Sequence, residues 1–273
     1  MHLSRTARLL LRLGTGLTLL FLYLPLLVIA LYAFNSRRTL KWPIPGLTLE
    51  WFDKAFHNPG VREALWTSLK AATGATLVAL LLGTLASLAV SRHRFFGRET
   101  ISFIVILPIA LPGIVTGMAL NATFREVLSP LGVGLGLFTV IVGHATFCIV
   151  VIYNNVIARL RRMSPNLEEA SADLGADMFQ TFRFVTFPLL RSALLAGGLL
   201  AVGLSFDEIV VTTFTNGLGS DMQTLPQWIL NNLSRGEQQP IVNVVATAVM
   251  VLSLVPVWAA QRLTGEHVGF AGR

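Results

Sequence analysis

The sequence predicts an all-α integral membrane protein with six transmembrane helices. Hydrophobic residues make up 53% of the 273 positions, and charged residues make up only 13%. The mean hydropathy of +0.67 is too high for a soluble domain of ordinary composition. Apolar runs long enough to cross a hydrocarbon core of about 30 Å recur along the chain. Within one transmembrane domain of residues 17–263, they lie at about residues 17–34, 64–90, 101–124, 137–160, 189–214 and 241–260.

The remaining composition argues against several other classes of protein. The net charge of +7 is dispersed among apolar spans and forms no basic, aromatic face for nucleic acid. Cys148 lies alone in an apolar run, so neither a disulfide framework nor a cysteine metal site is available. The five histidines lack the HxxxH or HExxH spacing of zinc hydrolases. We expect no nucleic-acid partner, no metal site and no catalytic residue in this chain.

The first apolar run follows a basic N-terminal segment. Residues 1–16 carry Arg5, Arg8 and Arg12, and we expect this segment to lie in the cytoplasm. A signal peptide is the alternative, but the run exceeds the usual core of about 7 to 15 residues and lacks an A-x-A-like exit. We therefore predict that residues 17–34 form the first transmembrane helix.

Residues 35–62 break the hydrophobic pattern and are predicted to form an external loop. Pro43, Pro45 and Gly46 disrupt regular structure there, and a short amphipathic helix is expected around residues 49–56. Trp42 and Trp51 are of the residue type that anchors proteins at the membrane interface. We predict that both tryptophans act as interfacial anchors.

The third apolar run contains two prolines, in the sequence LPIALPG. Pro108 and Pro112 each remove a backbone donor and clash with the preceding turn, so this helix is predicted to be kinked or locally unwound. In a bilayer, neighbouring helices or a water-lined cavity must satisfy the freed backbone groups. Two interpretations remain open: an ordinary proline kink, or a kink that lines a transport path.

The distribution of basic residues predicts that both termini lie in the cytoplasm. The first outer loop is the exception, because it carries several basic residues. The tail of residues 264–273 is then also cytoplasmic. The basic residues assigned to the cytoplasmic side are Arg5, Arg8, Arg12, Arg92, Arg94, Arg98, Arg159, Arg161, Arg162, Arg183, Arg191, Arg262 and Arg273. Those assigned to the outer side are Arg37, Arg38, Lys41, Lys54, Arg62, Arg125 and Arg235.

The polar segment of residues 164–188 joins two strongly apolar runs and is predicted to contain two short helices. Ser164 can cap a helix that begins at Pro165, where the missing N–H group is tolerated. Glu168 and Glu169 then lie in the early turns, where the helix dipole favours anions. We expect this helix to end at Gly175.

A second helix is expected directly after that glycine. Asp177 can cap it, and Gln180 stands three residues later, as in a capping box. The polar segment should end at Pro188, where the fifth span begins. The apolar side of the second helix is predicted to pack under the bundle through Phe179, Phe182 and Val185.

This segment resembles the cytoplasmic signature of the permeases of ABC importers. That signature reads E-A-A, three residues, G, nine residues, then I-x-L-P. The chain departs from it by Ser for the second Ala, Val for Ile and Phe for Leu. The matching positions are Glu169, Ala170, Ser171, Gly175, Val185, Phe187 and Pro188.

The resemblance extends over nearly the whole chain, through FNSRR, LTLEWF, LPIALPG and SFDEIVVTTF. These segments look like those of the second permease subunit of spermidine/putrescine-type importers. The resemblance implies a type I permease fold in a bacterial inner membrane and a heterodimer with a homologous permease. It also implies two cytoplasmic ABC ATPase subunits that bind ATP and Mg²⁺, and an external substrate-binding protein. The residues that would dock on the ATPase are Glu168, Glu169, Ala170, Ser171, Leu174, Gly175 and Pro188.

Asp207 and Glu208 are adjacent carboxylates in the fifth apolar run. An ionisable residue at the bilayer centre costs about 2.5 to 3.5 kcal/mol on insertion scales. A rise of about 1.5 Å per residue from Pro188 instead carries Asp207 to the outer mouth. The pair is either a wetted helix end or a place where one carboxylate meets a cationic substrate. In a continuous helix the two side chains point about 100° apart and cannot both face one lumen.

We therefore expect a permease subunit of an ATP-driven importer of a small cationic solute, such as spermidine or putrescine. An amino acid or an opine-like compound is an alternative cargo. A membrane-embedded enzyme is a less favoured alternative, because no nucleophile with a base is evident and His144 is isolated in the fourth run. A passive channel would show a selectivity-filter pattern, which is absent from the sequence.

Overall fold

The computed structural model describes residues 4–264 apart from 39–40, 94, 165 and 218–221. Nearly all of these residues are helical, and the one isolated β-bridge among them joins Asn35 to Leu47. The chain divides into two compact units, which are described separately. Unit 1 comprises Met1–Arg62 and Trp228–Leu252, and unit 2 comprises Glu63–Gln227 and Ser253–Arg273. The expectations for Arg94 and for most of the C-terminal tail lie outside the described residues.

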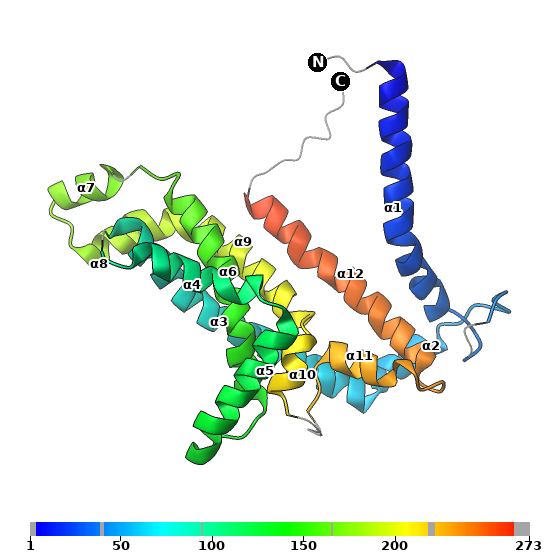
Figure 1. Cartoon of the computed structure of the whole chain (residues 1–273). Coiled ribbons are helices and arrows are strands. Elements are labelled where there is room, and N and C mark those ends of the chain that lie inside the picture. The colour runs from blue at the N-terminus through cyan, green and yellow to red at the C-terminus, as the bar shows by residue number, and fades with distance from the viewer. Residues whose placement is uncertain (1–3, 39–40, 94, 165, 218–221, 265–273) are drawn as a thin grey trace. The chain divides into compact units, whose positions relative to one another are not determined.

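Unit 1 begins with α1, Arg5–Ala33 (Figure 1). Most of the apolar side chains of α1 are exposed. The Ser4 hydroxyl caps this helix by accepting a hydrogen bond from the Ala7 N–H at 3.1 Å. The helix therefore begins well before residue 17 and takes in most of the basic segment predicted to precede it. Its exposed leucines, with Phe21 at 78% exposure, suit a helix that faces lipid.

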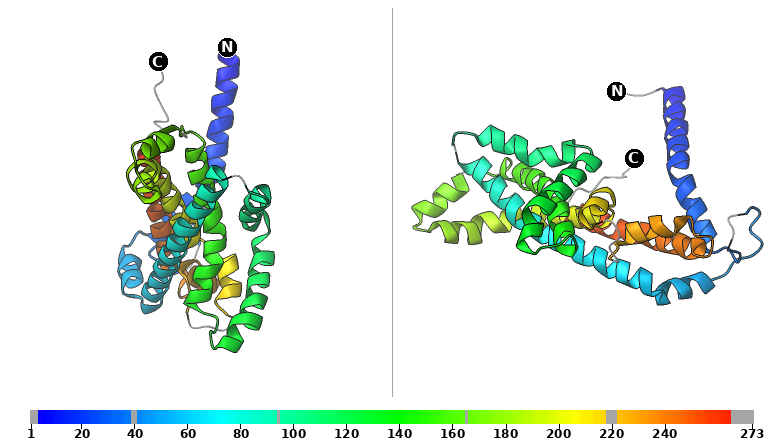
Figure 2. Two further views of the ribbon diagram at one scale, coloured as in Figure 1. Left: turned by 90° about the vertical axis from the view of Figure 1, so that its left-hand side faces the viewer. Right: turned by 60° about the horizontal axis from the view of Figure 1, so that its bottom comes forward.

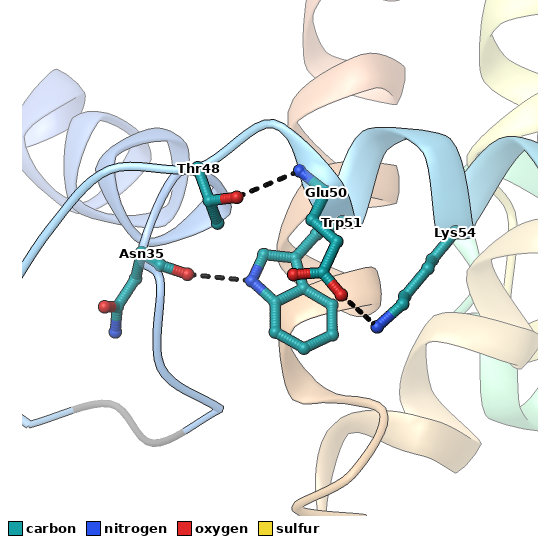
Figure 3. A network of polar contacts seen from close by, with 5 residues as sticks. All are labelled: Asn35, Thr48, Glu50, Trp51 and Lys54. Carbon is teal, nitrogen blue, oxygen red and sulfur yellow. Dashed lines mark hydrogen bonds and ion pairs between the residues drawn. The ribbon is translucent and has the colours of Figure 1, made fainter.

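The loop after α1 is held to the short helix α2, Glu50–His57, by Trp51. The Trp51 indole N–H donates to the Asn35 carbonyl at 2.8 Å, and the Thr48 hydroxyl accepts from the Glu50 N–H (Figure 3). A hydrogen bond from Lys54 lowers the pKa of the Glu50 carboxyl. Trp51 is only 4% exposed, so its prediction as an interfacial anchor is wrong, whereas Trp42 is 74% exposed.

The helices of unit 2 surround α6, Leu137–Leu160, which matches the fourth predicted span at both ends. Ile152, Val156 and Leu160 are buried and pack with Leu190 of α9. Small residues bring α3 close to α6: a Cβ on Gly83 would lie 3.0 Å from the Ile149 carbonyl oxygen. α7 and α8 lie at one end of unit 2 (Figure 1), as the right-hand view of Figure 2 also shows.

The other elements follow in chain order. The α-helices are α3 Pro59–Arg92, α4 Arg98–Ala110, α5 Gly113–Thr123, α7 Asn166–Asp173, α8 Met178–Thr181, α9 Phe187–Phe206, α10 Val210–Thr215, α11 Leu225–Leu233 and α12 Gln239–Thr264. The π-helical turns are Phe124–Leu128 and Phe182–Thr186, and a 3₁₀ turn spans Ser129–Leu131.

Among the described residues, four helices are long and apolar enough to cross a membrane, or five if the bent pair α4–α5 counts as one span. The four are α1, α3, α6 and the stretch Met178–Phe206. The predicted sixth span, residues 241–260, falls within α12, Gln239–Thr264. The count of six spans and the cytoplasmic position of both termini stay predictions.

Three predictions on the C-terminal side differ from the structure. The fifth span is not one helix over residues 189–214, because α9 ends at Phe206 and α10 begins at Val210. The helix also begins earlier, since a π-helical turn, in which the Phe187 N–H bonds to the Phe182 carbonyl, lets it run past Pro188. The predicted outer loop of residues 215–240 contains α11.

Candidate functional site

The first candidate region is the segment of residues 164–188, where α7 ends at a glycine as predicted. Gly175 has φ +83°, a left-handed conformation that a Cβ disfavours. Its N–H bonds to the Ala172 carbonyl at 2.8 Å, and the Ala176 N–H bonds to the Ser171 carbonyl at 3.1 Å. This pair of bonds is a Schellman motif, which stops the helix. The predicted role of Pro165 lies outside the described residues.

The second helix of this segment begins with the predicted capping box. The Asp177 carboxylate accepts from the Gln180 N–H at 2.8 Å, and the Gln180 side chain accepts from the Asp177 N–H at 3.0 Å. The hydroxyls of Ser171 and Thr181 lie 3.0 Å apart and join the two short helices. Since α8 continues through the π-helical turn into α9, the segment is directly connected to a membrane-spanning helix.

The tip of the segment presents apolar side chains to the outside. Leu174 is 89% exposed, Met178 85% and Phe179 68%. The prediction that Phe179 packs under the bundle is therefore wrong, although Val185 is partly buried. An apolar surface of this kind is typical of a protein interaction site. We call Leu174, Met178 and Phe179 the apolar tip.

The two neighbouring glutamates of α7 differ in their surroundings. Glu169 is exposed. The Glu168 carboxylate is partly buried and lies 3.0 Å from the Arg92 guanidinium at the end of α3. It also accepts a hydrogen bond from the Thr186 hydroxyl at 3.0 Å. The seven residues predicted to contact the ATPase therefore do not form one outward surface.

The second candidate region contains two interrupted helices. The predicted break in the third span is present: α4 ends at Ala110, α5 begins at Gly113, and the two parts meet at 107°. Pro108 lies inside α4, whereas Pro112 forms the N-cap of α5. The missing donor of Pro112 is tolerated at this position because the first N–H groups of a helix have no intrahelical partner.

The carboxylates of Asp207 and Glu208 lie at the second interruption, between α9 and α10. The Glu208 carboxylate accepts from the Val211 N–H at 2.8 Å and thereby caps α10. The Asp207 residue ends α9, and it is exposed. The expectation of two positions on one continuous helix is wrong, because the backbone leaves the helix here. The two residues therefore differ: the Glu208 carboxylate accepts a hydrogen bond from the backbone, whereas Asp207 is exposed.

The short helix α10 is held by α5 and α6. The Asn121 amide donates to the Phe214 carbonyl, and the Thr139 hydroxyl donates to the Thr215 carbonyl at 2.7 Å. A Cβ on Gly117 would lie 2.7 Å from the Phe214 ring, so α5 and α10 are in close contact. The two interrupted helices thus pack against each other.

His144 connects the two sides of the second interruption. Its Nδ1 lies 2.7 Å from the Ser205 hydroxyl of α9, and its Nε2 lies 2.8 Å from the Thr212 hydroxyl of α10. Thr212 also donates to the Glu208 carbonyl. All three hydrogen bonds form together if the neutral ring carries its proton on Nε2. Nε2 then donates to Thr212, Thr212 donates to the Glu208 carbonyl, and Ser205 donates to Nδ1.

His144 is therefore a buried core histidine, as the sequence suggested, but it is not isolated. Its partners are 61 and 68 residues away in the sequence, so no local pattern could reveal them. The sequence signal for this cluster is the presence of Ser205 and Thr212 in apolar runs. No group of three or more residues suited to a metal ion is found in the part of the chain that the structure describes.

Comparison with known proteins agrees with this arrangement. Residues 75–264 match the family described as "Binding-protein-dependent transport system inner membrane component". The spermidine/putrescine transport system permease protein PotC of Escherichia coli is 33% identical over 90% of this chain and 90% of its own length. The putrescine transport system permease protein PotI of E. coli is 31% identical over 84% of this chain and 82% of its own length.

Solved structures share the fold. A bacterial ABC transporter that imports the acidic polysaccharide alginate matches with a TM-score of 0.69 and 17% identity, over 98% of this chain and 99% of the other. The same kind of transporter in complex with an alginate pentasaccharide-bound periplasmic protein matches with a TM-score of 0.71 and 18% identity, over 94% and 93% of the two chains. The chain belongs to the family of binding-protein-dependent transport system inner membrane components, and it is a non-catalytic permease subunit of an ABC importer.

Proposed function

We propose that this permease imports a small cationic solute of the polyamine class, such as putrescine or spermidine, across a bacterial inner membrane. The observation that carries the proposal is the exposed Asp207 residue at the interruption between α9 and α10. A carboxylate forms strong, charge-assisted hydrogen bonds with an ammonium group. The similarity to PotC and PotI supports the same class of cargo.

Within this proposal, the interrupted helices form the substrate pathway. Pro112 and the α4–α5 break leave backbone groups outside regular helix bonding, and such groups are tolerated in a membrane where they line a cavity or are covered by protein. Discontinuous helices at a binding site are a recurrent device of transporters. Pro108 lies in α4, just before the break.

The cargo proposal is tested by changing the two carboxylates separately. Asp207→Asn should raise the KM for uptake of putrescine by about tenfold, because the negative charge that strengthens a hydrogen bond with an ammonium group is lost. Glu208→Gln is the matched control, since its side-chain oxygen can still accept from Val211. Uptake should be measured in proteoliposomes that hold the complete transporter with its binding protein. A wild-type KM for Asp207→Asn would refute the role of Asp207.

The partners follow from the same assignment. We propose a heterodimer with a homologous permease, two cytoplasmic ABC ATPase subunits that bind ATP and Mg²⁺, and an external binding protein. The exposed surface of α7 and the apolar tip would dock on one ATPase, through Glu169, Ala170, Leu174 and the neighbouring Gly175. This assignment requires residues 164–188 and both termini on the cytoplasmic side, with six spans between them.

Docking is tested by replacing Leu174 with aspartate, which places a charge on the apolar tip. Co-purification of the ATPase with Leu174→Asp should fall, whereas Leu131→Asp, at an exposed position outside this segment, should leave it unchanged. Full retention of the ATPase by Leu174→Asp would contradict docking through this surface.

A second cargo class is favoured by one relative. A protein named as a putative 2-aminoethylphosphonate transport system permease, PhnV of Salmonella choleraesuis, is 29% identical over 90% of this chain. Amine-bearing anions, amino acids and opine-like compounds therefore belong in the same test. Binding of each compound to the external binding protein, measured by calorimetry against putrescine and spermidine, distinguishes the two classes.

A further inference from the structure

We infer that Glu168 is a positioning residue that ties residues 164–188, which we call the coupling segment, to two membrane helices of its own chain, rather than a contact of the ATPase. The inference rests on the proposed docking of α7 on an ATPase subunit. It assigns different tasks to Glu168 and Glu169, although they are neighbours in the signature region.

The geometry places both partners on the same carboxylate oxygen. Glu168 Oε1 lies 3.0 Å from Nη2 of Arg92, and it accepts the hydroxyl hydrogen bond of Thr186 at 3.0 Å. The side chains of Arg92 and Glu168 are 19% and 24% exposed, and Thr186 is 4% exposed. Because the pair is partly withdrawn from water, it is screened less than an exposed ion pair.

The three residues belong to three different elements. Arg92 is the last residue of α3, where the helix dipole favours a cation, and Glu168 lies in the first turn of α7, where it favours an anion. Thr186 closes the π-helical turn that leads into α9. The carboxylate therefore joins α7 to the ends of two membrane helices.

This arrangement provides a route for movement. A displacement of α7 by the ATPase must either move the end of α3 and the start of α9 with it or break the contacts of Glu168. In the π-helical turn that ends at Thr186, the Phe187 N–H bonds to the Phe182 carbonyl, about five residues back instead of the four of an α-helix. Glu168 thus acts where the helix leading to the α9–α10 interruption is least regular.

The inference predicts uncoupling without loss of the ATPase. In the complete transporter in proteoliposomes, Glu168→Gln should keep the ATPase bound and active, while the ATP hydrolysed per solute imported rises by about tenfold. Thr186→Val, which preserves side-chain volume, should produce a smaller change in the same ratio. Glu63→Gln is the same chemical change at an exposed position of α3, outside the docking surface, and serves as the matched control.

A double-mutant cycle separates this tie from a general loss of charge. If Arg92 and Glu168 act as a pair, the double variant Arg92→Gln/Glu168→Gln should change the ATP hydrolysed per solute imported no more than either substitution alone. Additive effects, or a wild-type ratio for Glu168→Gln, would overturn the inference. Loss of the ATPase from the Leu174→Asp complex tests the docking proposal separately, so failure of one is distinguishable from failure of the other.

Discussion

Two helix interruptions in unit 2 are built in different ways. The one between α7 and α8 is closed by residues within it: Gly175 ends one helix, and Asp177 and Gln180 begin the next. The one between α9 and α10 has a local cap, from Glu208 to Val211, but it is also held by His144 and Asn121 of other helices, whose partners are between 61 and 93 residues away. The first interruption is locally encoded, whereas the second also depends on the tertiary structure.

This difference has a functional consequence. A locally capped, exposed turn can keep its shape while a partner pushes on it, because its hydrogen bonds do not depend on the rest of the bundle. An interruption held by neighbouring helices changes when those helices move. The coupling segment is therefore suited to receive a movement, and the α9–α10 interruption is suited to respond to it.

The largest expected effect comes from breaking the His144 contacts. His144→Leu leaves the buried hydroxyls of Ser205 and Thr212 without their ring partners, and it should lower the free energy of unfolding by about 3 kcal/mol. Hydrogen exchange should accelerate in α10 but not at the amides of residues 175 and 176.

A matched pair of substitutions sharpens this result. Thr212→Val and Thr213→Val are the same chemical change at adjacent positions, but Thr212 is buried against His144 and Thr213 is exposed. Only Thr212→Val should accelerate exchange in α10. Equal effects of the two would show that His144 does not hold the interruption.

The next effect tests the contact between the interrupted helices. Gly117→Ala would place a Cβ 2.7 Å from the Phe214 ring, which should destabilise the protein by about 2 kcal/mol. Gly203→Ala is the control, because nothing lies within 4 Å of its Cβ position in α9. Thermal unfolding of the purified chain in detergent measures both. A larger loss for Gly203→Ala would contradict the close packing of α5 on α10.

The sequence predicted the locally encoded features and missed those that depend on distant residues. The bounds of α6, the end of α7 at Gly175 and the Asp177 capping box are confirmed, because each follows from residues within a few positions. The α9–α10 interruption was missed because residues 207–209 contain neither glycine nor proline. An amphipathic pattern also could not tell whether Phe179 packs on its own chain or on a partner.

The smallest expected effect lies at the locally encoded interruption. Gly175→Ala meets no atom within 4 Å of the new Cβ, so its only penalty is the left-handed backbone, worth about 1 to 2 kcal/mol. The amides of residues 175 and 176 should then exchange about tenfold faster, while those of α10 keep their wild-type rates. Gly175→Asn should show a weaker effect, since asparagine tolerates this conformation better. Faster exchange that spreads into α10 would show that the two interruptions are coupled in the resting protein, and would remove the distinction between them.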